Sequence, residues 1–226
     1  MKAKKRTRAY AAVLAAACFF PAVLLAAGAL RREAAGSDLS KLFYGREEQV
    51  QSPPAKVTGQ PRKLIDILSL AGAPTSQWTN GNVWLPFPGS DTDPRGFACI
   101  RENAELEDAS LYPKVLETHP EWRDEHGLIV GIFRIAKLPA KAVFKAEVGL
   151  LKGASQSDGV KFRVYARKDP SFDASTWCAY DGKLDLIGLS LDRYAGQEVE
   201  LVLEVHVLKT STQDWAVWVS PRVEWE

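Results

Sequence analysis

Three segments in the second half of the chain, 142–150, 160–167 and 198–207, alternate apolar and polar residues. A period of two means that one face of each strand is buried and the other meets water, as in antiparallel sheets. No long segment shows the helical period of about 3.6 residues. The positions expected to face the core are Phe144, Ala146, Val148, Leu150, Val160, Phe162, Val164, Ala166, Val199, Leu201, Leu203, Val205 and Val207.

Turn signals separate these segments, for example Ser-Asp-Gly at 157–159 and Tyr-Asp-Gly at 180–182. Earlier in the chain, residues 64–68 predict a first strand, with a short helix as the alternative, and Pro, Gly and Asn then punctuate residues 72–94 densely. Many short strands at this spacing are typical of a sandwich or jelly roll. We therefore predict an all-β fold, an antiparallel β-sandwich over residues 63–226.

The N-terminus is basic and then apolar. Five Lys and Arg residues in 1–8 precede a run without charge from Ala9 to Leu30. This order predicts an export signal in residues 1–30, as either a signal peptide cleaved before Leu30 or an uncleaved membrane anchor through residues 9–30. The small residues at 27–29 favour cleavage, whereas the length of the run favours an anchor. Both alternatives place the remainder outside the cytoplasm, because more positive charge precedes the run than follows it.

The composition and the charge of the chain change after the predicted leader. Residues 31–62 are rich in Arg, Glu, Gln, Ser, Pro and Lys, and we expect a flexible tether there. The whole chain has a formal net charge of +1, but without the five cations of residues 1–8 the remaining 24 basic and 28 acidic residues give −4. A mildly acidic remainder lacks the electrostatic footprint of a nucleic-acid binder. We therefore expect no nucleic-acid partner.

Besides Cys18 in the apolar run, the chain has two cysteines, Cys99 and Cys178. In an oxidising compartment such a pair can form a disulfide, and two separate buried thiols are the equal alternative. The three histidines show no metal-site spacing with these cysteines. A structural calcium ion near Asp214 would need clustered oxygen ligands that the sequence does not establish. We therefore expect no cofactor and no metal.

Four sequence motifs follow one another between His119 and Glu226. They comprise a His before a strand, AEVGL at 146–150, the hairpin SDGVKFRV at 157–164 and DWAVW at 214–218. The series resembles the NPCBM-type carbohydrate-binding modules and related galactose-binding-like jelly rolls of bacterial secreted and surface proteins. The resemblance covers about half of the chain. It implies a galactose-binding-like β-sandwich that binds carbohydrate without catalysis.

Sugar binding needs an aromatic platform and a few polar groups that hydrogen-bond hydroxyls. We single out Trp122, Trp177 and Tyr180 as platform candidates, with His119 and Asp214 as polar ligand-binding candidates. The alternative is that the rings cap the core or cover sheet edges, and that the polar groups make structural hydrogen bonds. The aromatic residues in or beside predicted loops are Trp78, Trp84, Trp122, Trp177 and Tyr180.

Motifs of known catalytic machinery are missing from the sequence, which has no nucleophile elbow and no zinc-protease helix. Carboxylates do occur in pairs, at 91 and 93 and within 102–107, but exposed acidic loops explain them. We predict no enzyme but a non-catalytic, extracytoplasmic, carbohydrate-binding-like module whose partner is a polysaccharide. The alternative is a structural or protein-interaction module of the cell surface, with a surface protein as its partner and no glycan ligand.

We expect alkaline phosphatase fused to the C-terminus to be active when the full chain is expressed in bacteria. The reason is that the basic and then apolar order of residues 1–30 directs export, and this reporter works only outside the cytoplasm. The matched control lacks residues 1–30 and should be inactive. Equal activity of the two fusions would contradict the export prediction.

Overall fold

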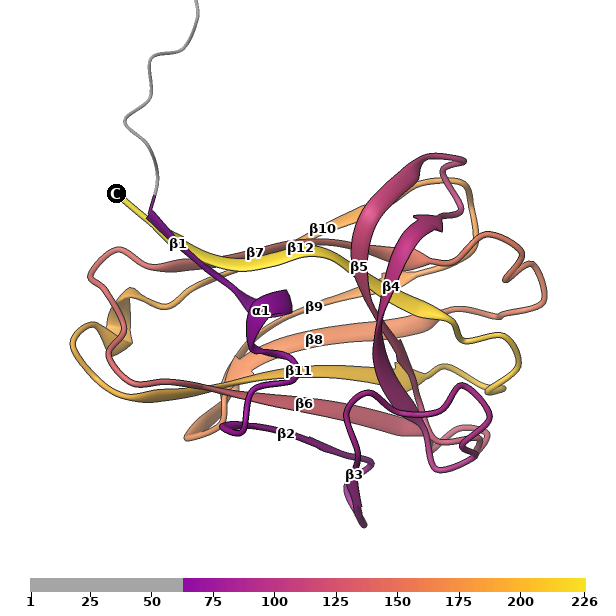
Figure 1. The fold of residues 1–226 in the computed structure, drawn as a ribbon, viewed down its shortest axis with the longest axis horizontal. Coiled ribbons are helices and arrows are strands. Elements are labelled where there is room, and N and C mark those ends of the chain that lie inside the picture. The colour runs from indigo at the N-terminus through magenta and orange to yellow at the C-terminus, as the bar shows by residue number, and fades with distance from the viewer. Residues whose placement is uncertain (1–62) are drawn as a thin grey trace, which may run out of the picture. The chain divides into compact units, whose positions relative to one another are not determined.

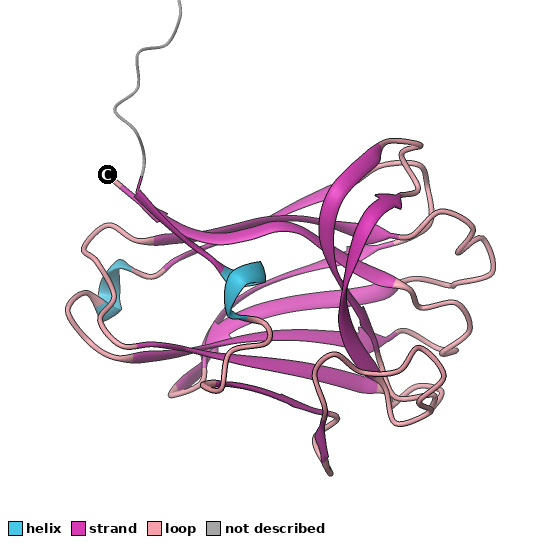
Figure 2. Cartoon of the chain, in the orientation of Figure 1, coloured by secondary structure: helices cyan, strands magenta, loops and turns pink. Residues whose placement is uncertain are grey.

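The structure, a computed structural model, describes residues 63–226, which form two antiparallel β-sheets packed face to face (Figures 1 and 2). The all-β sandwich prediction is confirmed. The predicted leader, residues 1–30, and the predicted tether, residues 31–62, lie outside the described residues. Within the described part of the chain, no helix is long and apolar enough to cross a membrane.

Sheet A has the strand order β10-β7-β12-β5-β4, and β1 pairs with the last residues of β12. Its strands are β1 (Lys63–Asp66), β4 (Phe97–Glu105), β5 (Leu111–His119), β7 (Val143–Leu150), β10 (Asp185–Ser190) and β12 (Ala216–Trp225). Sheet B has the order β3-β2-β6-β11-β8-β9. Its strands are β2 (Ser76–Thr79), β3 (Trp84–Leu85), β6 (Leu128–Ile135), β8 (Val160–Ala166), β9 (Asp169–Cys178) and β11 (Val199–Val207).

Helical structure in the described region is limited to two short elements, α1 (Ile67–Leu70) and η1 (Asp192–Tyr194). The sequence allowed either a strand or a short helix for residues 64–68. The structure has both, because this segment contains the end of β1 and the start of α1. β1 ends at Asp66, whose side-chain Oδ1 accepts a hydrogen bond from the Leu68 backbone N–H at 2.9 Å and so caps α1. This turn places Ile67 in the core.

The alternation predicted the core correctly, since all thirteen expected core positions are buried. At the centre of the sandwich, Trp218 of β12 meets Phe162 of β8 edge to face, with ring centroids 4.9 Å apart. Phe144 of β7 packs on the same indole at 6.4 Å. Such edge-to-face pairs are favoured by the ring quadrupole in addition to the burial of their area. These three rings therefore join sheet A to sheet B.

The strand β11 departs from the simple alternation at two positions. On β11, Val202 and Glu204 occupy positions expected to face water, yet both are buried. Val202 packs with Val130 and Ile132 of β6 in a second apolar cluster. The reason is that β11 lies in the middle of sheet B, where neighbouring side chains cover its outer face as well as its inner face.

The two described cysteines are free thiols, so the candidate pairing of Cys99 with Cys178 is corrected to two separate buried residues. Cys178 faces the core from β9 of sheet B. Cys99 alternates with the core residue Ala98 on β4 of sheet A and therefore points to the outer side, where its Sγ lies 3.5 Å from a Glu117 carboxylate oxygen. Because the side chains point into different parts of the molecule, no bridge can form without rebuilding a strand.

We expect Gly131→Ala to destabilise the protein by about 1–3 kcal/mol, as overpacking of a core does. A Cβ at Gly131 would lie 2.7 Å from two ring atoms of Trp78. This indole cannot easily move, because its Nε1–H donates to the Ala71 carbonyl at 3.1 Å and its ring stacks on Phe87.

The matched control is Gly188→Ala on β10, where the added carbon would meet only the Phe144 carbonyl at 3.4 Å. That change should alter the free energy of unfolding by no more than about 0.5 kcal/mol. Urea unfolding of the two variants and the parent measures both effects. Similar stability of the two variants would contradict the packing argument.

Candidate functional site

The outer face of sheet B carries rows of side chains that continue across its strands. Neighbours in a row are register partners, so their side chains lie next to one another. The central row, from β9 to β3, consists of Ser175, Arg163, Glu204, Val130, Thr79 and Trp84. The rows on either side consist of Trp177, Lys161, His206 and Leu128, and of Asp173, Tyr165, Val202, Ile132 and Gln77.

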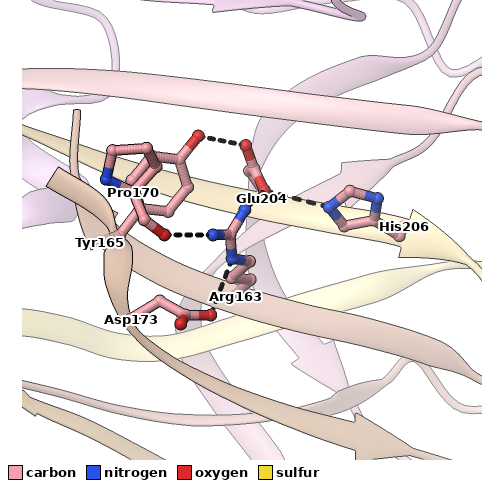
Figure 3. A network of polar contacts seen from close by, with 6 residues as sticks. All are labelled: Arg163, Tyr165, Pro170, Asp173, Glu204 and His206. Carbon is pink, nitrogen blue, oxygen red and sulfur yellow. Dashed lines mark hydrogen bonds and ion pairs between the residues drawn. The ribbon is translucent and has the colours of Figure 1, made fainter. Parts of the chain in front are cut away.

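Glu204 is the centre of a polar cluster on this face, shown in Figure 3. Its side chain is 9% exposed and accepts hydrogen bonds from the Tyr165 hydroxyl, from Arg163 Nη1 at 3.2 Å and from His206 Nε2 at 3.0 Å. We call Arg163, Tyr165, Asp173, Glu204 and His206 the Glu204 cluster. Because β8, β9 and β11 supply these residues, the cluster exists only when the sheet is assembled.

The arginine of the Glu204 cluster is fixed from several sides. Arg163 Nε donates to an Asp173 carboxylate oxygen at 2.8 Å, and its guanidinium also donates to the Pro170 carbonyl. The guanidinium carbon lies 4.4 Å from the centre of the Tyr165 ring, which is cation–π contact distance. The polar groups are therefore held in place without a ligand.

Electrostatics keep Glu204 and Tyr165 each in one protonation state. Burial alone would raise the pKa of Glu204, but the hydrogen bonds from His206 and Tyr165 and the charge of Arg163 outweigh it and lower the pKa. Burial and the bond to Glu204 raise the pKa of Tyr165. The carboxylate therefore stays ionised and the phenol stays a hydrogen-bond donor across the physiological pH range.

A groove of about 420 Å³ lies beside this cluster, and we call it the sheet B groove. The β2–β3 hairpin forms one wall with the exposed side chains of Val83 and Trp84. The floor is apolar, formed by Val130, Ile132 and Val202. Three polar residues complete the lining on the other side, and they are Tyr165, Arg167 and Glu204.

Of the five predicted ligand-binding residues, only Trp177 lies on this sheet face. It is 57% exposed, and Lys161 Nζ lies 5.4 Å from its ring centre. It does not line the sheet B groove itself but stands in the row next to the central one.

His119 and Trp122 lie together, outside the rows of sheet B. His119 is buried at the end of β5, where it stacks on Phe97, and its Nδ1 lies 2.7 Å from the Pro120 carbonyl oxygen. Burial lowers the pKa of His119, so the ring is neutral. Trp122 is 49% exposed and its ring centre lies 6.0 Å from that of His119. A structural role, the alternative considered for His119, matches this burial.

Tyr180 and Asp214 also lie outside the sheet B groove. The Tyr180 hydroxyl accepts a hydrogen bond from the Gly153 backbone N–H at 3.2 Å. Asp214 is fully buried, and its Oδ1 accepts from the Ser157 hydroxyl at 2.6 Å, whereas its Oδ2 has no hydrogen-bond partner among the described residues. This burial matches the structural alternative for Asp214, and its role as a ligand contact stays a prediction. Burial raises its pKa to about 7, and the charges of Asp158 and Asp124 add to the effect.

Sequence reasoning missed the Glu204 cluster. Arg163, Tyr165 and Glu204 occupy the polar positions of two alternating strands, which by themselves indicate an ordinary wet face. The sequence did contain a signal for such a cluster, because these polar positions hold residues of opposite charge and a tyrosine. Trp84 belongs to the loop aromatics of the sequence but not to the predicted ligand-binding residues. No group of three or more His, Cys, Asp or Glu side chains in residues 63–226 is arranged to hold a metal ion.

A second groove, also of about 420 Å³, lies on the outer side of sheet A and includes Trp215, Arg101 and Lys152. Both cationic side chains already pair with carboxylates. Arg101 bonds to the buried Glu117, and Lys152 pairs with Glu105. Its lining contains one half-buried tryptophan and no ring as exposed as Trp84. The sheet B groove is therefore the stronger candidate.

No family model matches this chain. An uncharacterised protein of Archaeoglobus fulgidus is 29% identical over 124 residues, which cover 49% of this chain and 30% of that protein. The chain thus matches less than a third of the length of this curated relative.

Several solved structures resemble the chain at low identity. The CBM51-2 and INT domains of Clostridium perfringens ZmpB, in complex with GlcNAc, are 21% identical with a TM-score of 0.39, over 55% of this chain and 27% of that one. The CBM51 of a Clostridium perfringens GH95 protein, in complex with methyl-galactose, is 15% identical with a TM-score of 0.41, over 71% and 99%. A Stig cyclase from Fischerella sp. TAU is 11% identical with a TM-score of 0.47, over 76% and 92%. At these scores the resemblances assign no ligand and no reaction to this chain.

We expect the stability of the protein to fall as pH rises from about 4 to about 7, and Asp214→Asn to weaken this dependence. The ordinary pKa of 3.8 is raised to about 7 by burial, so the folded protein retains a proton that the unfolded chain loses. Each unit of difference corresponds to about 1.4 kcal/mol, so the total effect is a few kcal/mol at most.

Urea unfolding at a series of pH values measures this dependence. Asp181→Asn, which changes an exposed aspartate in the same way, is the matched control and should keep the slope of the parent protein. An unchanged slope in Asp214→Asn would show that Asp214 does not hold the proton.

Proposed function

We propose that this protein binds a glycan, without cleaving it, on the outer face of sheet B. One observation carries the proposal: two exposed rings, Trp84 and Trp177, share a sheet face with the preorganised Glu204 cluster. Flat rings stack on the apolar faces of sugars, and fixed polar groups hydrogen-bond their hydroxyls. This face offers both kinds of contact.

Binding fits the carboxylates of this face better than hydrolysis does. Glycoside hydrolysis typically uses two carboxyl groups on either side of the scissile bond, one of them a protonated acid. Here hydrogen bonds lower the pKa of Glu204, and Asp173 is bonded to the same arginine. Asp214 does have a raised pKa, but its side chain is fully buried.

We also place the module outside the cytoplasm, delivered by residues 1–30 as a cleaved signal or as an anchor in the membrane. The basic and then apolar order of that segment supports this. Membership of the NPCBM-type modules is part of the same proposal, and the order of motifs from His119 to Glu226 supports it.

The rival function is a surface module that binds another protein. Such a surface would present a flat apolar patch, whereas the rows beside Trp177 are largely charged. Fold alone does not separate the two functions, because β-sandwiches host both.

We expect the purified chain to bind at least one polysaccharide on a glycan array, with a micromolar to millimolar Kd, which is about −8 to −4 kcal/mol. Trp84→Ala and Trp177→Ala should each weaken binding by about 1–3 kcal/mol through loss of stacking area, without unfolding the protein. Trp122→Ala is the matched control, since it removes an exposed ring outside this face.

Binding that depends on Trp215 instead would move the site to the groove of sheet A. Failure of the folded parent to bind any glycan, together with capture of a specific protein, would favour the rival function. Thermal unfolding of each variant separates loss of binding from loss of fold.

A further inference from the structure

Two exposed tryptophans stand at opposite edges of sheet B. Trp84, on β3, is 60% exposed and Trp177, on β9, is 57% exposed. β3 and β9 are the outermost strands of the six in the sheet. With strands spaced about 4.8 Å apart, the two edges lie roughly 24 Å from one another. That separation is several times the size of one sugar ring.

Both rings point to the same side of the sheet. Trp84 continues the row of Thr79, Val130 and Glu204, whereas Trp177 stands in the adjacent row with Lys161. Leu85, the neighbour of Trp84 in β3, faces the core, as does Cys178, the neighbour of Trp177. A linear molecule laid across the strands would therefore meet a ring near each end.

The surface between the rings is apolar toward Trp84 and polar toward Trp177. Beyond Thr79, the direct neighbour of Trp84, lie the apolar side chains of Val130 and Ile132, and next to Trp177 lie Lys161 and the Glu204 cluster. A polysaccharide can contact both parts, since each of its units has an apolar ring face and a rim of hydroxyls. A single terminal sugar would reach only one end of this surface.

Charges on this face are balanced and mostly paired. Arg134 pairs with Glu198, Arg163 with Asp173 and Glu204, and Arg167 with Glu200. An acidic glycan would have to compete with these carboxylates for the guanidinium groups. The pairing therefore favours an uncharged chain, whose hydroxyls can add to such pairs as donors or acceptors without separating them.

We infer that the outer face of sheet B binds a neutral, extended oligosaccharide that lies across the strands from Trp84 to Trp177. This inference rests on the proposed glycan-binding function and specifies the length and charge of the ligand. The two rings act as separate end contacts, and the Glu204 cluster acts between them.

The test is isothermal titration with ladders of neutral β-1,3-glucan, β-1,4-glucan, β-1,4-mannan and β-1,4-galactan, from monosaccharide to hexasaccharide. For at least one ladder, affinity should rise about tenfold or more from disaccharide to hexasaccharide. Trp84→Ala and Trp177→Ala should each reduce hexasaccharide affinity about tenfold, and the double variant about a hundredfold, because contacts so far apart act independently. Leu186→Ala, an exposed leucine of β10 in the other sheet, is the control and should change nothing.

The outcomes separate this inference from the function on which it rests. Binding with equal affinity for short and long chains would overturn the extended site but leave glycan binding intact. Stronger binding to polygalacturonate than to any neutral ladder would overturn the neutral class. A folded parent that binds no member of any ladder and no array glycan would overturn the proposed function itself.

Discussion

The edge-to-face packing of Trp218 on Phe162 is the central contact of the core between the two sheets. Trp218 belongs to sheet A and Phe162 to sheet B, so their contact, with Phe144 alongside, joins the two sheets. Each sheet buries one face in this core, and the alternation of β7, β8 and the inner side of β11 follows from that requirement. Any ligand must therefore bind to an outer face, to a strand edge or to the loops.

The outer faces of the two sheets carry different apolar patches. On sheet A, residues of the β4–β5 hairpin and its turn, Ala104, Leu106 and Val115, pack with Val217 and Val219 of β12 and bury an apolar patch. On sheet B, Val130, Ile132 and Val202 form a smaller patch that leaves the groove below Trp84 open. The sheet B face thus keeps both an apolar floor and exposed rings, which is the combination that the proposed function needs.

Burying Glu204 in that face would be costly without its donors. Removing a carboxylate from water disfavours the charged form, and a single unpaired partner would leave a buried charge. Tyr165, Arg163 and His206 satisfy it from two strands, and Asp173 in turn orients Arg163. A fully satisfied network of this kind holds its groups in one arrangement, so that a ligand meets oriented polar groups and loses little entropy in ordering them.

The alternation of apolar and polar residues was enough to predict the fold class and the core of the second half of the chain. Alternation is a local property, and a strand with a period of two needs only its neighbours in sequence to show which side is buried. The thirteen positions from Phe144 to Val207 were therefore predicted correctly. The same rule assigned Arg163, Tyr165 and Glu204 to the polar side. It could not show that these side chains contact one another in the folded sheet.

Which polar and aromatic side chains lie together depends on the pairing of strands that are distant in the sequence. The register of β8 on β11 places Arg163 opposite Glu204, which lies 41 residues further along the chain. The registers of β2 on β6 and of β3 on β2 bring Trp84 to the same face, and the fold buries the Asp214 side chain. The orientation of β4 and β9 keeps Cys99 and Cys178 apart in the same way. Strand pairing between distant segments is set by the packing of the whole sandwich, and for that reason local sequence patterns do not reveal it.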